Sequence, residues 1–186
     1  MDRLHKLREL IDGRLIIAVG DITKFEGDAI VNAANSTLYG GGGVDGAIHH
    51  AGGTAILEEC RKIRQEQWRD GLPAGKAVAT TGGFLPARYV IHTVGPIWEG
   101  GGNYEAETLF SCYRESLEEA RKLQASQIAF PAISTGVYGY PREKAAVVAY
   151  QAVSDFLSQN RVPERVWLLF FTSEDANIFL KAIPVK

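Results

Sequence analysis

The sequence predicts an α/β fold, a three-layer α/β/α sandwich with a mixed, mostly parallel central sheet. Short apolar runs typical of strands alternate with longer segments whose apolar residues recur at helical spacing. The last such run, residues 166–171, is apolar throughout, as expected for a strand that helices cover on both faces. At 186 residues, the chain is most simply one domain, residues 1–186, with a substantial core.

The same patterns predict the individual elements. Near the N-terminus, four apolar residues at helical spacing predict a short amphipathic helix over residues 2–12. They are Leu4, Leu7, Leu10 and Ile11. The expected strands are 14–19, 28–34, 77–81, 89–93, 128–132 and 166–171. The further expected helices are 44–51, 54–68, 104–123, one starting at Pro141 and one after position 172, with Thr54 and Ser173 as N-caps.

The segment between the strand 28–34 and the helix 44–51 is built to hold an anion. It contains four consecutive glycines, Gly40–Gly43, which let the backbone adopt positive φ and approach a ligand closely. The helix that follows presents unpaired N–H groups and the positive end of its dipole. We therefore expect an anion pocket here, with Asn35 and Asp45 at its mouth.

The positions of the cationic residues decide how this pocket would work. No Lys or Arg lies between Phe25 and Cys60, and none lies in residues 131–141. A phosphate would be held by backbone N–H groups rather than by side-chain charge. Phosphoryl-transfer loops carry a lysine among their glycines, so its absence argues against kinase or NTPase chemistry.

Four of the expected strands end at residues that could contact a ligand. They are Asp21, Asn35, the segment Ser134–Tyr138 and, at the end of the last strand, Phe171. Ligands of such sheets bind at the carboxyl ends of the strands. The four segments are therefore expected to converge on one cleft.

Composition excludes several partners. A net charge of −2 gathers no polyanion, so duplex nucleic acid is a poor fit. No apolar run is long enough to span a bilayer, and the charged N-terminus lacks the apolar region of a secretory signal. Cys60 and Cys112 are interpreted as structural thiols, and we expect a cytoplasmic monomer.

Five segments together carry a family resemblance. They are GDIT at 20–23, VNAANS at 31–36, GGGGVDGAIH at 40–49, IHTVGP at 91–96 and AISTGVYGYP at 132–141. In this order and spacing they resemble a macrodomain of the MacroD type. The resemblance implies binding of ADP-ribose, removal of mono-ADP-ribose from acidic side chains, and deacetylation of O-acetyl-ADP-ribose. A reader module that binds ADP-ribose without turnover is the alternative.

The resemblance also implies a ligand-binding set. It comprises Asp21, Ile22, Ala34, Gly42, Gly43, Val44, Ser134, Thr135, Gly136, Val137, Tyr138 and Phe171. Asp21 and the Ile22 N–H would bind the adenine edge, although Asp21 could instead only close a turn before Thr23. Phe171 matches an aromatic residue that stacks on the ligand in the family. Adjacent strand residues face opposite ways, however, so one of Phe170 and Phe171 must face the core, and we expect Phe171 to face the ligand. Tyr138 stands where some family members carry Phe.

Asn35 and Asp45 are the implied catalytic pair. In the family the equivalent residues lie beside the distal ribose, where they would orient the sugar and a water. Asp45 could instead be an N-cap or first-turn acid, a role compatible with catalysis. Binding alone requires neither residue, so their joint presence favours an enzyme. Asn32 is expected to satisfy backbone groups at the strand end.

Other chemistries are poorly supported. Residues 41–46 satisfy G-x-G-x-x-G, but Ser36–Gly40 intervene after the strand and Gly52-Gly53 end the helix early, unlike a dinucleotide-binding oxidoreductase. His49 and His50 point about 100° apart on a helix, and no Cys–His spacing suggests zinc. His92 is expected to be a core histidine. We therefore expect no metal and no cofactor, and ADP-ribose or ADP-ribosylated substrates as partners.

Overall fold

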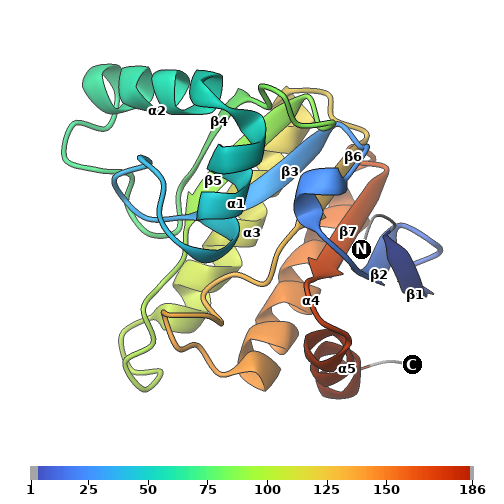
Figure 1. The fold of residues 1–186 in the computed structure, drawn as a ribbon. Helices are drawn as coiled ribbons and strands as arrows, with labels where there is room; N and C mark the ends of the chain where they lie inside the picture. The colour runs from blue at the N-terminus through green and yellow to red at the C-terminus, as the bar shows by residue number, and fades with distance from the viewer. Residues whose placement is uncertain (1–3, 185–186) are drawn as a thin grey trace.

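The computed structural model describes residues 4–184, which form a mixed sheet covered by helices on both faces (Figure 1). Its strands are β1 (His5–Leu10), β2 (Leu15–Val19), β3 (Ala29–Ala34), β4 (Ala77–Thr81), β5 (Tyr89–Val94), β6 (Gln127–Phe130) and β7 (Arg165–Phe170). Its helices are α1 (Gly43–Gly52), α2 (Thr54–Glu66), α3 (Glu105–Lys122), α4 (Arg142–Gln159) and α5 (Ser173–Ala182), with a short 3₁₀ helix, η1 (Ile22–Lys24).

The order of the strands brings four carboxyl ends together. Within the described residues the sheet runs β1-β2-β7-β6-β3-β5-β4. The pairs from β2 to β5 are all parallel, whereas β1 and β4 are antiparallel at the edges. The neighbours β2, β7, β6 and β3 therefore end at the same edge of the sheet. The predicted mixed, mostly parallel sheet is confirmed, and so is the clustering of the four strand ends.

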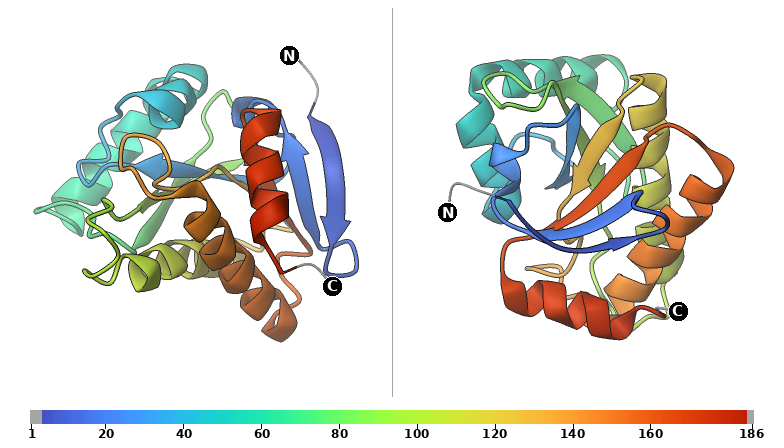
Figure 2. Two further views of the ribbon diagram at one scale, coloured as in Figure 1. Left: turned by 90° about the horizontal axis from the view of Figure 1, so that it is seen from below. Right: turned by 90° about the vertical axis from the view of Figure 1, so that its right-hand side faces the viewer.

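Each face of the sheet packs against its own helices (Figure 2). One core contains α3, α4 and α5 side chains such as Leu117, Val153 and Phe179. The other contains Ile48 of α1 and Ile56 of α2. Adjacent residues of β2 divide between the two cores because successive side chains of a strand point to opposite faces. The three-layer sandwich is therefore confirmed.

The predicted N-terminal helix is wrong. Residues 2–3 of that prediction lie outside the described part, but His5–Leu10 forms β1 and pairs antiparallel with β2. The register shifts between Lys6 and Arg8, so a bulge at Leu7 breaks the alternation and leaves a spacing that imitates a helix. The fully buried β2 also needs a partner for its free edge, and β1 supplies the hydrogen bonds.

The helix starts differ in detail from the predicted caps. Gly53 precedes α2, with Thr54 as its first residue. Thr172, rather than Ser173, caps α5, because its side chain accepts a hydrogen bond from the Asp175 N–H. α4 begins directly after Pro141, as predicted. Among residues 4–184, no helix combines the length and apolar character that a membrane span needs.

Candidate functional site

The first loop of the site connects β3 to α1. Asn35 follows the last residue of β3, and its side chain accepts hydrogen bonds from Thr37 N and Oγ1 while its Nδ2 donates to Gly40 O at 3.1 Å. This closed turn sets the path of the glycines. Gly42 is the N-cap of α1 and is exposed, so the N-terminal end of α1, with its unpaired N–H groups, lies at the protein surface.

A close backbone contact holds this loop against α1. A Cβ at Gly46 would lie 2.5 Å from the carbonyl oxygen of Gly41, whereas a Cβ at Gly42 would meet no atom within 4 Å. Gly46 is therefore needed for the approach of the loop to the helix, and Gly42 lies against open space. The predicted phosphate-binding residues Gly42, Gly43 and Val44 lie at this open end of α1.

The second loop follows β6 and spans residues 131–141. Ser134 adopts a positive φ of 63°, and its carbonyl accepts from Tyr140 N at 2.9 Å, which closes the loop. Trp98 N donates to Tyr138 O at 2.8 Å and fixes the outer side. Among residues 4–184, the backbone N–H groups of residues 135–138 donate none of the hydrogen bonds found, so they are free for a ligand.

The ends of β2 and β7 carry the residues predicted for a base. Asp21 caps η1 by accepting from Thr23 N and Oγ1 at 2.9 and 2.7 Å, so the turn-closing role is present, whatever else this carboxylate binds. Phe171 is 74% exposed directly after β7, whereas Phe170 lies in the core. The Ala34 side chain is buried, so only its backbone could reach a ligand.

The two predicted catalytic side chains both lie close to Gly41. A Cβ at Gly41 would lie 3.1 Å from Asp45 Oδ2 and 3.2 Å from Asn35 Nδ2. Asp45 lies in the first turn of α1 and is only 4% exposed. The structure thus places one carboxylate oxygen and one amide nitrogen close to the same position beside Gly41, next to the exposed glycines of the first loop.

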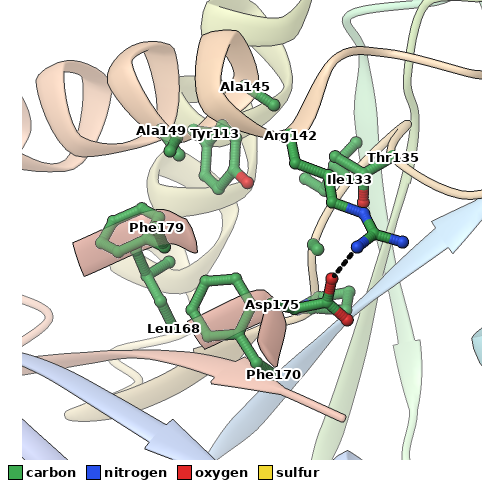
Figure 3. A pocket seen from close by; sticks show the side chains of 13 residues that line it. Tyr113, Ile133, Thr135, Arg142, Ala145, Ala149, Leu168, Phe170, Asp175 and Phe179 are labelled. Atoms are coloured by element: carbon green, nitrogen blue, oxygen red, sulfur yellow. Dashed lines mark ion pairs between the residues drawn. The ribbon is translucent and has the colours of Figure 1, made fainter. Parts of the chain in front are cut away.

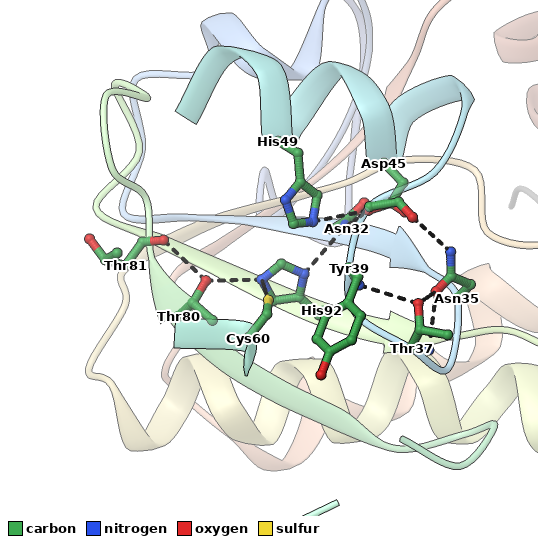
Figure 4. Close-up of polar contacts among 11 residues, drawn as sticks. Asn32, Asn35, Thr37, Tyr39, Asp45, His49, Cys60, Thr80, Thr81 and His92 are labelled. Atoms are coloured by element: carbon green, nitrogen blue, oxygen red, sulfur yellow. Dashed lines mark hydrogen bonds and ion pairs between the residues drawn. The ribbon is translucent and has the colours of Figure 1, made fainter. Parts of the chain in front are cut away.

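Behind Asp45 lies a line of buried polar side chains (Figure 4). Asn32 Nδ2 donates to Asp45 Oδ1 at 2.6 Å and lies 3.1 Å from His92 Nδ1. His92 Nε2 in turn lies 2.9 Å from Thr80 Oγ1. The expectation that Asn32 satisfies backbone groups at the strand end is wrong, because Asn32 lies inside β3 and its side chain bonds to other side chains.

The charge state of Asp45 reflects these contacts. Burial raises the pKa of Asp45 above its ordinary value, and the Asn32 hydrogen bond and nearby His49 oppose that rise. His49 Nε2 lies 3.4 Å from Asp45 Oδ1. Burial also lowers the pKa of His92 to about 3, so this imidazole is neutral at physiological pH. The core position expected for His92 is confirmed.

A Cys–His grouping that the linear spacing does not reveal adjoins this line. His49, Cys60 and His92 have ligand atoms within 4.8 Å of one another, although they come from α1, α2 and β5. Burial raises the pKa of Cys60 to about 12, so it is a neutral thiol, as expected of a structural cysteine. The packing of α1 and α2 against the sheet brings these positions together, so their linear spacing gives no sign of the grouping.

Two hollows border the site. An open groove of about 590 Å³ extends from Ser36, next to Asn35, to Tyr138 of the second loop. A separate cavity of about 30 Å³, room for about one water, lies beneath Thr135 among apolar core side chains (Figure 3). Arg142 and Asp175 form an ion pair at 3.1 Å beside that cavity. Neither Asn35 nor Asp45 lines it, and its size excludes a nucleotide.

Comparison with known proteins gives a consistent result. The Macro domain family matches residues 31–149. A Macro domain-containing protein of Methanosarcina mazei is 53% identical over 175 residues, covering 94% of this chain and 90% of that protein. The O-acetyl-ADP-ribose deacetylase of Salmonella typhimurium is 51% identical over 170 residues, covering 91% and 94% respectively.

Solved structures of macrodomains are also similar to this chain. The Oceanobacillus iheyensis macrodomain with ADP superposes with a TM-score of 0.91 at 44% identity, covering 97% of this chain and 95% of that one. The Trypanosoma brucei macrodomain in complex with ADP-ribose gives a TM-score of 0.82 at 37% identity, covering 91% and 68%. With a match over most of its length and relatives above half identity, this chain belongs to the Macro domain family.

Proposed function

We propose that this protein binds ADP-ribose and hydrolyses ADP-ribosyl esters, removing mono-ADP-ribose from acidic side chains and deacetylating O-acetyl-ADP-ribose. The observation that carries the proposal is the placement of Asn35 Nδ2 and Asp45 Oδ2 close to the same position at Gly41, beside two loops with free backbone N–H groups. The solved relatives with ADP or ADP-ribose and the relatives named O-acetyl-ADP-ribose deacetylase support it.

Binding would use the full edge of the sheet. The adenine would lie by Asp21, the Ile22 N–H and Phe171, at the ends of β2 and β7. The diphosphate would lie between the N-terminus of α1 and the N–H groups of residues 135–138, a grip made of backbone dipoles. The distal ribose then falls at the Gly41 end, because this completes the path from β2 across β7 and β6 to β3.

Hydrolysis would use Asp45 as the base that assists a water. A general base works best when its pKa is close to the operating pH, and burial moves the pKa of Asp45 in that direction. Asn35 would orient the sugar and the water with its amide, which the Gly40 carbonyl and Thr37 hold in place. The attack of water on the ester carbonyl releases the free acid and ADP-ribose.

A reader module without turnover is the second candidate. A binding function needs the two loops but has no need of a buried, partly desolvated carboxylate beside the sugar. Replacing Asp45 separates the two candidates, because the carboxylate is required for turnover and lies outside the backbone grip.

The decisive experiment compares Asp45→Asn and Asp45→Ala with the unaltered protein. We expect ADP-ribose binding by calorimetry to stay within about threefold, while hydrolysis of O-acetyl-ADP-ribose and of a glutamate-linked mono-ADP-ribosylated protein falls by about 100-fold or more. The matched control is Asp155→Asn, which removes the same charge from the exposed face of α4. Binding without any turnover by the unaltered protein would establish the reader instead, and unchanged turnover in both variants would remove Asp45 from the mechanism.

A further inference from the structure

The buried side chains behind Asp45 form a chain of hydrogen bonds, and the donor and acceptor of each bond can be assigned by starting from Thr80. Thr80 Oγ1 donates to the carbonyl oxygen of Thr81 at 3.1 Å, and a carbonyl can only accept. The hydroxyl hydrogen of Thr80 is thereby used, so its oxygen accepts from His92 Nε2 at 2.9 Å. His92 therefore carries its hydrogen on Nε2 and has a lone pair on Nδ1.

This tautomer determines which way the Asn32 amide points. A lone pair on His92 Nδ1 requires a donor, and the nitrogen of Asn32 lies 3.1 Å away. The second hydrogen of the same nitrogen points at Asp45 Oδ1, 2.6 Å away. A flipped amide would place the Asn32 oxygen against two acceptors, the His92 lone pair and the Asp45 carboxylate.

The groups around Asn32 and His92 favour the same arrangement. Asn32 and His92 are both fully buried, so no water competes for these hydrogen bonds at their surfaces. The titratable groups near the line are His49 of α1, Cys60 of α2 and Asp45 itself. Cys60 Sγ lies 3.8 Å from His92 Nε2, and its high pKa keeps it uncharged. Both nitrogens of His92 are engaged, which leaves no lone pair with which the His49, Cys60 and His92 group could bind a metal.

We propose that His92 is a positioning residue for the hydrolytic reaction: as the neutral Nε2–H tautomer, locked by Thr80, it orients the Asn32 amide so that the amide donates to Asp45. The inference rests on the proposed catalytic role of Asp45. It gives the histidine of the 91–96 segment a function that neither contact with the ligand nor packing provides. Asn32 separates His92 from Asp45, and the full burial of His92 keeps its side chain away from a substrate in the cleft.

The kinetic test compares two variants of equal shape, His92→Asn and His92→Leu. The Asn oxygen can take the place of Nδ1 as acceptor, whereas Leu offers none, and both leave the same gap beside Thr80. For His92→Leu we expect kcat on O-acetyl-ADP-ribose to fall about 10- to 100-fold with ADP-ribose affinity within about twofold. For His92→Asn we expect kcat within about threefold of the unaltered protein.

The pH profile adds a readout that packing alone would not move. Loss of the Asn32 hydrogen bond removes an effect that lowers the pKa of Asp45, so the acid limb of the kcat/KM profile should move to higher pH in His92→Leu and stay in place in His92→Asn. Equal losses in the two variants, or no loss in His92→Leu, would overturn the proposal.

Nitrogen NMR tests the tautomer independently of activity and of whether those variants fold. In the unaltered protein the ¹⁵N shifts of His92 should show the Nε2–H tautomer without titration between pH 5 and 8, and Thr80→Val, which keeps the side-chain shape, should increase the Nδ1–H form. An Nδ1–H tautomer in the unaltered protein, or a charged His92, would refute the positioning role. If the unaltered protein binds ADP-ribose but lacks turnover, the proposed hydrolase function fails. The NMR spectrum still shows, in that case, whether His92 has the tautomer that orients Asn32.

Discussion

Asp45 must satisfy two opposing demands. As a carboxylate with 4% exposure it pays the cost of desolvation, which raises its pKa. Asn32 supports the charged form with a 2.6 Å hydrogen bond, and His49 lies 3.4 Å away. A neutral side chain of the same shape would avoid the cost of burying a charge, so the residue proposed to act as the base is expected to make the fold less stable than it could be.

We therefore predict that Asp45→Asn raises the melting temperature at pH 7 by about 2–4 °C, the response of a domain of this size to about 1 kcal/mol. The folded pKa of Asp45 is raised, so the protonated form is favoured in the folded state. That contribution is fully present below the ordinary value of 3.8 and is lost as the pH rises through the folded pKa.

The increase in melting temperature of Asp45→Asn over the unaltered protein should accordingly shrink as the pH falls towards 3.8. Thermal melts of both proteins at several pH values measure it, with Asp155→Asn as the surface control. A lower melting temperature for Asp45→Asn at pH 7, with correct folding, would show that the Asn32 and His49 contacts outweigh burial.

At the scale of single elements, the approach to α3 is organised by one carboxylate. Glu105, the first residue of α3, is buried and accepts from the backbone N–H groups of Glu99, Gly101 and Asn103 at 2.9, 2.9 and 2.6 Å. Burial raises its pKa, but these hydrogen bonds prevail and hold the pKa at about 2. The ordered loop supports Trp98, whose backbone N–H donates to the carbonyl oxygen of Tyr138 in the second loop.

Glu105→Gln is predicted to lower the melting temperature at pH 7, because the amide nitrogen would face one of the three N–H donors. The folded pKa of Glu105 is depressed, so its stabilising contribution is present above 4.5 and is lost as the pH falls towards about 2. In thermal melts, the difference in melting temperature between Glu105→Gln and the unaltered protein should become smaller over this pH interval.

Glu107→Gln is the matched control, since Glu107 lies exposed in the same helical turn. Equal effects of the two substitutions would mean that charge near the α3 dipole, and not the three hydrogen bonds, accounts for the stability. A deficit that is constant from pH 7 to pH 2 would equally contradict the assignment.

At the scale of the whole molecule, Arg14 joins parts of the chain that are far apart in sequence. Its guanidinium, just before β2, donates to five backbone carbonyls at the end of α4 and in the connection to β7. They belong to Leu157, Asn160, Arg161, Pro163 and Glu164. A cation at the end of α4 also complements the helix dipole.

Arg14→Met is predicted to lower the free energy of unfolding by at least about 2 kcal/mol, since several carbonyls lose a charged donor. Arg14→Lys should recover only part, because a point charge cannot reproduce the planar fork. Denaturant melts measure both changes. Arg61→Met, at an exposed position of α2, is the control, and a loss no larger than the control's would refute the bridging role.

The sequence predicted most of the architecture because the determining signals are local. Apolar runs, helical stripes and glycine clusters identified β2 to β7 and α1 to α5, and the strand ends indicated where a cleft would form. The N-terminal helix was mispredicted, because the pairing of β1 with β2 joins residues across a turn and a bulge hides the alternation of its side chains.

The sequence predicted less of the candidate site than of the fold. Asn35 and Asp45 stand in a glycine-rich segment, so their proximity followed from a short connection. The contacts of Asn32 with Asp45 and His92 depend on three elements meeting in the interior, and no spacing encodes them. The positioning role proposed for His92 rests on burial and hydrogen-bond direction, and both depend on the three-dimensional structure.

The two loops of free N–H groups contain no lysine or arginine. Peptide dipoles act only at short range, so the proposed backbone site has no far-reaching attraction for other polyanions, and binding there would displace few counterions. Affinity for a diphosphate should then vary little with ionic strength, and encounter should proceed without electrostatic acceleration. Nucleic acids and free nucleotides in the cell would therefore compete for this cleft only as far as their shapes fit it.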